Sequence, residues 1–228
     1  IKTKIKDGFW LVFDFGGGTF DAALLKIEDG IFNVVSTEGD NYLGGKNIDY
    51  AIIDEILIPY FQENFKIEDI HSNDEKLGRF RNQFKDKAEQ LKISLSSKQS
   101  EDLISQLGEN FGNDDEGTPF EFDLTVTRED LNKVQESFFQ RAIDITKELL
   151  KRNNLKGNQI DALILVGGPT LTPLLRDMLK EQITEKIDFS VDPMTVVAKG
   201  AALFASTLKR NEIEKPSIDT IEFVDFDP

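Results

Sequence analysis

The sequence predicts an α/β domain that opens with three antiparallel strands and carries an inserted α+β segment. Residues 9–13 are all apolar, which is typical of a strand buried on both faces. Asp29-Gly30 is a strong signal for a two-residue hairpin turn. After residue 127, apolar residues at helical spacing precede and follow a second run of apolar residues at 162–166, which is typical of a buried strand. These features place strands first and alternating helices and strands last.

The opening strands are expected at residues 9–13, 20–27 and 31–36. The inserted segment is expected at 44–127, and it begins with a helix over 46–65 whose apolar residues are spaced by four. Pro59 should bend that helix or end it early, because its ring crowds the carbonyl of Glu55.

A capping box at Ser72 to Glu75 predicts the start of a second inserted helix. Its apolar stripe consists of Leu77, Phe80, Phe84, Ala88, Leu91 and Leu95. Residues 100–126 are expected to form a small sheet with one solvent-exposed face, because apolar and polar side chains alternate from 120 to 126.

The remaining elements return to the main domain. Thr127 with Asp130 predicts the start of another helix. The stripe of that helix consists of Leu131, Val134, Phe138, Ala142, Ile145 and Leu149. A strand at 162–166, a helix over 172–182, a short strand near Phe189 and a helix over 193–208 follow. Residues 209–228 are polar and are expected to be a linker into a further domain.

Composition and charge exclude several classes of protein. The chain has 228 residues, no cysteine, one histidine and a formal net charge of −15. The acidic balance argues against nucleic-acid binding, and no apolar run is long enough to span a membrane. Without cysteine, zinc fingers and thiol nucleophiles are not expected, and with His71 as the sole imidazole Ser-His-Asp triads are not expected. The absence of cysteine fits a reducing cytosol, and the start at Ile1 indicates a piece of a longer protein.

The first candidate site is the turn between the first two strands. It contains Gly16, Gly17, Gly18 and Thr19. The glycines remove every Cβ from the bend, so their N–H groups can approach an anion closely. Asp14 and Asp21 flank the turn, and carboxylates beside a phosphate cradle suit Mg²⁺ held through water. The pattern predicts a phosphate site, and the alternative is a glycine-rich hairpin with two surface acids.

Two further stretches are candidates for contacts to a nucleoside. Gly167-Gly168 joins a buried strand to a helix, where the backbone can approach a base or ribose, and a simple strand-to-helix turn is the alternative. Glu89, Lys92 and Ser96 fall on one side of their helix, away from its apolar stripe. Such a triplet is usually a solvated face.

Gly44-Gly45 is either a tight connection or a hinge into the inserted segment. Gly45-Lys46 does not make a Walker loop, because Asn47 follows where that motif has serine or threonine.

Taken together and in order, these stretches resemble the DnaK-type 70 kDa heat-shock chaperone family, in the C-terminal lobe of its nucleotide-binding domain. D-F-G-G-G-T-F-D at 14–21 is similar to the second phosphate motif, and L-G-G at 43–45 resembles the start of the upper subdomain. K-A-E-Q-L-K-I-S-L-S-S at 87–97 resembles the adenosine-contacting helix. V-G-G-P-T at 166–170 resembles the adenosine motif, and residues 191–202 resemble the closing hinge helix.

The resemblance implies a fold and a division into domains. The fold would be an actin-like ATPase (ribonuclease H-like) lobe with an inserted α+β subdomain. Residues 1–43 and 128–208 would form the ribonuclease H-like base of the lobe, and 44–127 the inserted subdomain at its top. Residues 209–228 would be the interdomain linker and the start of the substrate-binding domain.

The resemblance also implies roles for the candidate residues, with ATP or ADP and Mg²⁺ as cofactors. Asp14 would position the catalytic water and, with Asp21, the Mg²⁺. The terminal phosphates would be held by Gly16, Gly17, Gly18 and Thr19. Ribose and adenine would be contacted by Glu89, Lys92 and Ser96, with Gly167 and Gly168 packed against the nucleoside.

Three residues depart from the pattern of the family. Pro169 and Leu171 stand where many members have serine and a basic residue, and Met194 stands where aspartate is usual. Leu171 cannot place a cation over adenine as an arginine does.

The function implied is that of an ATP-driven chaperone that assists protein folding under stress in the cytoplasm. Its partners would be an N-terminal ATPase lobe, a C-terminal substrate-binding domain, unfolded clients, co-chaperones and a nucleotide exchange factor, without nucleic acid or membrane. The first phosphate loop and the catalytic lysine and glutamate would precede this segment, so the chain alone is expected to be inactive. The alternative is a non-chaperone actin-like ATPase, such as a filament protein or a relative of the sugar kinases.

Overall fold

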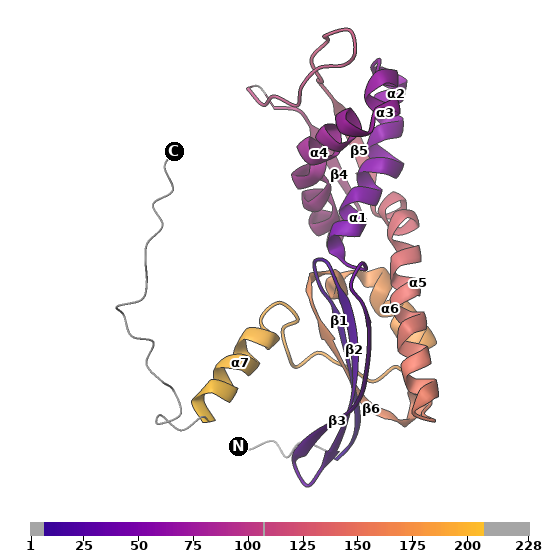
Figure 1. The fold of residues 1–228 in the computed structure, drawn as a ribbon, viewed down its shortest axis with the longest axis vertical. Coiled ribbons are helices and arrows are strands. Elements are labelled where there is room, and N and C mark those ends of the chain that lie inside the picture. Colours follow the sequence, from indigo (N-terminus) through magenta and orange to yellow (C-terminus); the bar gives the residue numbers. More distant parts are fainter. Residues whose placement is uncertain (1–6, 107, 208–228) are drawn as a thin grey trace, which may run out of the picture. The chain divides into compact units, whose positions relative to one another are not determined.

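The protein contains a five-stranded sheet in the order β3-β2-β1-β6-β7 (Figure 1). The structure is a computed structural model that describes residues 7–106 and 108–207. The described chain divides after Met194 into two units, the second of which contains α7 (Val196–Thr207). The strands of the sheet are β1 (Gly8–Phe15), β2 (Phe20–Glu28), β3 (Ile31–Asp40), β6 (Ile160–Val166) and β7 (Ile187–Asp188).

The prediction of three consecutive antiparallel strands is confirmed. β1 pairs antiparallel with β2, and β2 pairs antiparallel with β3, whereas β6 runs parallel to β1 and β7 parallel to β6. Asp29 and Gly30 have φ angles of 52° and 77°, which are the positive values that a tight two-residue hairpin turn requires. The carboxyl ends of β1 and β6 therefore meet at the same edge of the sheet, next to the glycine-rich turn.

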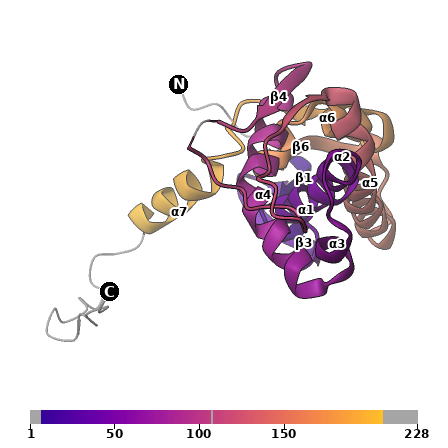
Figure 2. The ribbon, with the colours of Figure 1, turned by 90° about the horizontal axis from the view of Figure 1, so that it is seen from above.

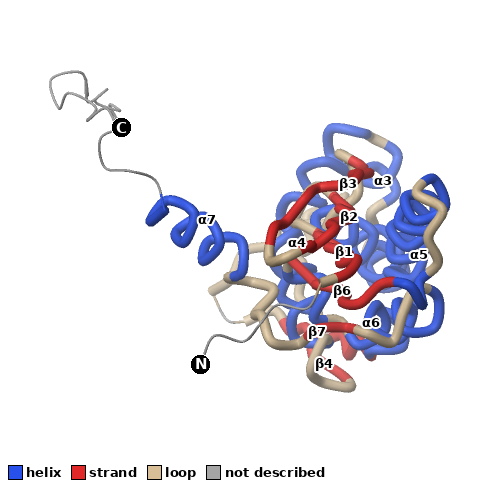
Figure 3. The backbone as a smooth tube through the Cα atoms, turned by 90° about the horizontal axis from the view of Figure 1, so that it is seen from below, coloured by secondary structure: helices blue, strands red, loops and turns tan. Residues whose placement is uncertain are grey.

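Helices α5 (Arg128–Arg152) and α6 (Pro173–Gln182) lie on one face of this sheet (Figure 3). The ring of Phe15 packs edge-on against that of Phe139, with centroids 5.7 Å apart. The predicted stripe of α5 included Phe138, but Phe139 is the fully buried residue and Phe138 is only partly buried. The predicted cap is confirmed, because the side chains of Thr127 and Asp130 each accept the backbone amide of the other residue.

The segment between β3 and α5 contains four α-helices and a two-stranded sheet (Figures 1 and 2). The elements are α1 (Gly45–Ile52), α2 (Ile58–Asn64), α3 (Glu68–Ser72), α4 (Asp74–Leu95), β4 (Ser100–Ile104) and β5 (Asp123–Thr127). Their core is a cluster of phenylalanine rings around Phe61, whose centroid lies 4.8–5.5 Å from those of five other rings. Those rings belong to Phe65, Phe80, Phe84, Phe120 and Phe122.

Of the two expected effects of Pro59, a bend or an early end of the first inserted helix, the early end is wrong, because α2 continues through Pro59 to Asn64. A π-helical turn at Ile53–Leu57 joins α1 to α2, and the amide of Ile58 donates to the carbonyl of Ile53, five residues earlier. The wider turn leads directly into Pro59, so the helix continues despite the donor that proline lacks.

Two other boundaries differ by a few residues from those predicted. Asn73, and not Ser72, caps α4, since its Oδ1 accepts the amides of Glu75 and Lys76 at 3.0 and 3.1 Å. β5 begins only at Asp123, although Phe120 and Phe122 before it are buried in the Phe61 cluster, as the predicted alternation requires. The predicted linker at 209–228 lies outside the described residues.

Candidate functional site

The glycine-rich turn after β1 is held in place by the first residues of α1. The amide of Gly16 donates to the carbonyl of Thr19 at 2.8 Å, which closes the turn. The carbonyls of Gly16 and Gly17 accept the amides of Gly45 and Lys46 at 2.9 and 2.7 Å. The first amides of α1 therefore hold the turn by its carbonyl groups.

The amide side of the turn is open to a ligand. Within residues 7–106 and 108–207, no acceptor contacts the amides of Gly17, Gly18 or Thr19. A Cβ added at Gly17 or Gly18 would meet nothing within 4 Å. Free amide donors beside open space are the arrangement that binds phosphate oxygens.

Two other glycines allow the backbone segments around this turn to approach closely. A Cβ at Gly44 would lie 2.5 Å from the Cα and N of Gly18. Gly167 has a φ of +89°, and a Cβ there would lie 2.1 Å from the carbonyl oxygen of Phe15. Both positions require glycine for steric reasons, and they bring the chain after β3 and the chain after β6 against the turn.

Asp14 and Asp21 lie opposite each other in the β1–β2 ladder, at the ends next to the glycine turn. Partial burial, and then the neighbouring charge of Asp21, raise the pKa of the Asp14 carboxyl. A cation placed between the two carboxylates would relieve this repulsion. In the described part of the chain no three acidic or histidine side chains form a metal site. Mg²⁺ would therefore need ligands from phosphate and water, as is usual for this ion.

A cavity of about 410 Å³ lies beside the turn and brings together residues from five separate stretches of the chain. Of the predicted site residues, it is lined by Gly17, Glu89, Lys92, Ser96 and Gly168. The predicted residues outside its lining are Asp14, Gly16, Gly18, Thr19, Asp21 and Gly167. These six belong to the glycine turn, to the strand ends beside it or to the close contact with Phe15.

Lys92 forms a buried ion pair instead of pointing a free charge into the cavity. Its Nζ lies 2.5 Å from Oδ1 of Asp49 and 3.2 Å from the carbonyl of Gly45. The side chains of Lys92 and Asp49 are 13% and 2% exposed. Burial raises the pKa of Asp49, the hydrogen bond and charge of Lys92 oppose that shift, and the neighbouring charge of Glu89 adds to it. Lys92 therefore joins α4 to α1 at the wall of the cavity.

Several lining residues were missed from the sequence, among them Lys46, Asp49, Lys85 and Ile93. Lys46 is exposed and lines the cavity together with Gly17, and the described residues provide no carboxylate partner for it. Its position directly after Gly44-Gly45 was the available signal, because that glycine pair contacts the glycine turn.

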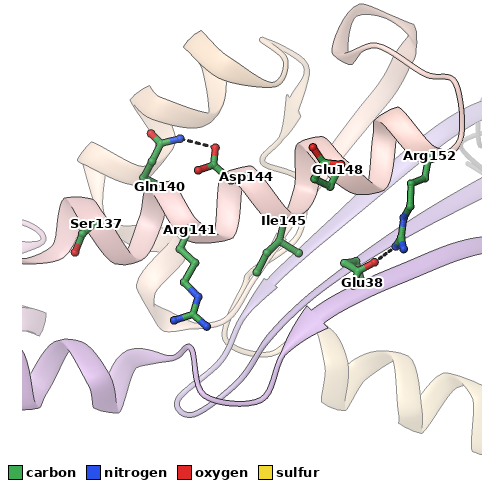
Figure 4. A pocket seen from close by; sticks show the side chains of 8 residues that line it. All are labelled: Glu38, Ser137, Gln140, Arg141, Asp144, Ile145, Glu148 and Arg152. Atoms are coloured by element: carbon green, nitrogen blue, oxygen red, sulfur yellow. Dashed lines mark hydrogen bonds and ion pairs between the residues drawn. The ribbon is translucent and has the colours of Figure 1, made fainter.

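A second cavity, of about 670 Å³, lies between α5 and β3 (Figure 4). Its lining charges are paired with protein groups: Arg152 with Glu38, Arg141 with Asp40, and Glu148 with Lys151. It contains none of the predicted site residues, so its size alone does not make it a ligand site.

The sequence comparison identifies the family. The family model described as Hsp70 protein matches residues 1–227. The chain belongs to the Hsp70 family. The mixed α/β structure with its five-stranded sheet agrees with the actin-like ATPase lobe fold expected for an Hsp70 protein. Membership supports a chaperone ATPase function, with ATP or ADP and Mg²⁺ as ligands and client proteins and co-chaperones as partners. It favours this Hsp70 function over the alternative of a filament protein or a sugar kinase.

No helix in the described part of this Hsp70 chain combines the length and the apolar character needed to cross a membrane.

Proposed function

We propose that the chain is the C-terminal nucleotide-binding lobe of a DnaK-type chaperone ATPase. We further propose that a nucleotide binds with its phosphates at the glycine turn and its nucleoside in the cavity beside α4. The observation that carries the proposal is the convergence of Gly17, Glu89 and Gly168 on one cavity, although they are far apart in the sequence. A cavity of about 410 Å³ is within the size range of small-molecule sites.

The phosphate end of the nucleotide would lie at the glycine turn. The free amides of Gly17, Gly18 and Thr19 would donate to phosphate oxygens, and Lys46 would add positive charge beside Gly17. Gly16 closes the turn and keeps those amides in place.

The nucleoside end would lie along α4 and the chain after β6. Glu89 is exposed on the cavity wall, and its carboxylate can accept from ribose hydroxyls. The hydroxyl of Ser96 donates to the carbonyl of Ile93 at 2.7 Å, so its oxygen is oriented as an acceptor for a ligand. Lys92 supports this wall through Asp49, and Gly167 and Gly168 bring the backbone close to the nucleoside.

Asp14 is the proposed catalytic residue and, with Asp21, the proposed Mg²⁺ site. When bound, Mg²⁺ neutralises charge that develops on the transferred phosphoryl group. Asp14 would orient the attacking water as a hydrogen-bond acceptor, and its raised pKa makes it a stronger base than an ordinary aspartate.

We further propose that residues 1–43 and 128–208 form the base of the lobe, 44–127 its upper subdomain, and 209–228 the linker to a substrate-binding domain. The ring cluster around Phe61, whose rings all belong to the inserted segment, supports this division. In the full-length cytoplasmic stress protein, a second ATPase lobe would complete the site, and clients, co-chaperones and a nucleotide exchange factor would be the partners. The 228-residue chain would bind nucleotide without turnover, because phosphoryl transfer needs charge from several sides.

Calorimetric titration with Mg·ATP tests the proposal in the full-length protein and in the 228-residue chain. Glu89→Ala should weaken ATP binding by about tenfold, the value of one hydrogen bond to a charged group. Gln90→Ala is the matched control, because Gln90 is the exposed neighbour on α4 and does not line the cavity. Equal affinities for these two variants would contradict the assignment of the nucleoside end. Steady-state ATP hydrolysis by the chain alone, lost in Asp14→Ala, would contradict its proposed inactivity.

A further inference from the structure

The first residues of α1 lie between the glycine turn and α4, and they bind both. The amides of Gly45 and Lys46 donate to the carbonyls of Gly16 and Gly17 at 2.9 and 2.7 Å. The carbonyl of Gly45 accepts from Nζ of Lys92, on α4, at 3.2 Å. Gly45 therefore joins the glycine turn to α4 through its two backbone groups.

The two hydrogen bonds to the turn determine where its open amides point. The carbonyl of Gly16 and the amide of Gly17 belong to one planar trans peptide unit, and the carbonyl of Gly17 shares the next unit with the amide of Gly18. Because each unit is rigid, a carbonyl held by α1 directs the amide of the same unit to the opposite side. The amides of Gly17 and Gly18 are the donors proposed to bind phosphate, so α1 aims them.

Asp49 holds Lys92 in the position from which it reaches Gly45. Oδ1 of Asp49 lies 2.5 Å from Nζ of Lys92, and the Asp49 side chain is 2% exposed. Asp49 follows Gly45 by four residues on α1, so the carboxylate and the carbonyl lie on the same face of the helix and converge on one ammonium group. Without this carboxylate, the flexible four-carbon stem of the lysine would have many other conformations open to it beside the cavity.

Close packing carries the position of α1 into the turn. A Cβ added at Gly44 would lie 2.5 Å from the backbone nitrogen and Cα of Gly18, and one added at Gly45 would lie 3.3 Å from Nζ of Lys92. Gly44 and Gly18 meet backbone against backbone, without a flexible side chain to absorb a displacement. A shift of α1 relative to α4 would therefore move the turn and its amides.

We propose that Asp49 is a positioning residue of the glycine turn, which keeps the open amides aimed at a bound phosphate chain through Lys92 and Gly45. This inference rests on the proposed nucleotide site. A direct effect of the Asp49 charge has the opposite sign, because a carboxylate that lines the cavity repels phosphate. Removal of the carboxylate tightens phosphate binding if only its charge matters, and weakens phosphate binding if it positions the turn.

The test measures the binding of Mg·ATP and of inorganic triphosphate with Mg²⁺ to the full-length protein by calorimetry. Triphosphate has no nucleoside, so its affinity reports on the turn and not on contacts to a base or ribose. Asp49→Asn should weaken triphosphate binding by about tenfold, the value of one hydrogen bond to a charged group. Asp49→Asn combined with Lys92→Met should give a similar loss. This double variant leaves the net charge of the site unchanged and no buried charge unpaired, so its loss reports geometry alone.

The matched control is Asp54→Asn combined with Arg81→Met. These two residues form an ion pair with contacts of 2.7 and 2.8 Å, which joins α4 to the π-helical turn that follows α1. Neither residue lines the cavity. The control therefore removes the same kind of link between the same elements without reaching Gly45, and triphosphate binding should not change.

The outcomes separate the positioning role from the site on which it rests. If the unaltered protein binds neither ligand, the proposed function fails and the positioning role fails with it. Binding of Mg·ATP without triphosphate overturns the positioning role, because the turn then holds no phosphate chain for Asp49 to affect. A double variant that matches the control, or tighter triphosphate binding by Asp49→Asn, overturns it and leaves the nucleotide site in place. Circular dichroism at the assay temperature checks that the variants are folded, and either Asp49 variant decides the test if the other is unfolded.

Discussion

Replacement of Lys92 by methionine should expose the cost of an unpaired buried charge. Methionine keeps most of the apolar stem and removes the ammonium group that lies 2.5 Å from Asp49. Asp49 is 2% exposed, so water cannot replace the lost partner. The bond from Lys92 to the carbonyl of Gly45 at 3.2 Å is lost as well.

The expected loss is about 3 kcal/mol of unfolding free energy, at the lower end of the range for removing one partner of a buried ion pair. The lower end applies because Lys92 is itself 13% exposed, and solvent already screens the pair in part. For a chain of this size, the loss corresponds to a fall in Tm of about 6–12 °C.

The destabilisation should shrink as the pH falls from neutral into the acidic range. The pKa of Asp49 in the folded protein is already raised by burial, and Lys92 opposes that shift. In Lys92→Met the pKa rises further, so the carboxyl takes up a proton at a higher pH than in the unfolded chain. A group with a raised folded pKa destabilises the fold above that pKa, and this cost disappears once the group is protonated.

Urea unfolding followed by circular dichroism at neutral and acidic pH measures both effects. Lys98→Met is the control, because Lys98 is 60% exposed in its pair with Glu101 and should cost no more than about 1 kcal/mol. Adding Asp49→Asn to Lys92→Met should recover part of the loss, since the buried charge is then absent. The reasoning is refuted if Lys92→Met costs no more than the control, or if its cost grows on acidification.

Four further outcomes are expected. Gly167→Ala should lower the unfolding free energy by about 3 kcal/mol or more in thermal melts, because its φ is positive and its Cβ would lie 2.1 Å from a backbone oxygen. Gly17→Ala, with nothing within 4 Å of its Cβ, should be nearly neutral, and equal effects would contradict the steric argument. Asp14→Asn should raise Tm slightly by removing a repelled carboxylate. In the unaltered protein, Mg²⁺-dependent ATP affinity should fall as pH falls through the raised pKa of Asp14, and a flat pH profile would contradict this competition. Phe61→Ala should cost about 3–5 kcal/mol, with lost hydrogen-exchange protection concentrated in the inserted segment to which the rings around Phe61 belong, and uniform loss across the sheet would contradict this local effect.

Local patterns predicted most helices and strands because each depends on residues near one another in the chain. The Asp29-Gly30 turn and the Thr127–Asp130 capping box formed as expected, since both use interactions within a few residues. Prediction failed where a distant partner decided the outcome. The residues before β5 alternate like a strand and their rings are buried around Phe61 as expected, but pairing with β4 begins only at Asp123.

The candidate site could be predicted in part for the same reason. The glycine turn, the α4 triplet and Gly167-Gly168 are short motifs, and the structure brings members of all three to one cavity. The pairing of Lys92 with Asp49 could not be predicted, because the two residues lie on separate helices. The same holds for Ile93 and Leu171, whose shared position depends on how α4 and the chain after β6 meet.

The sequence by itself determined the α/β class, the order of the elements and the absence of side chains from the glycine turn. These properties follow from periodicity, from capping and from the absence of Cβ atoms, all of which are local. Only the tertiary structure decided which charges are free and which are neutralised: Lys92 is paired, and Lys46 is left to face the cavity. The physical reason is that burial and charge pairing depend on neighbours in space, which the packing of α1 against α4 supplies.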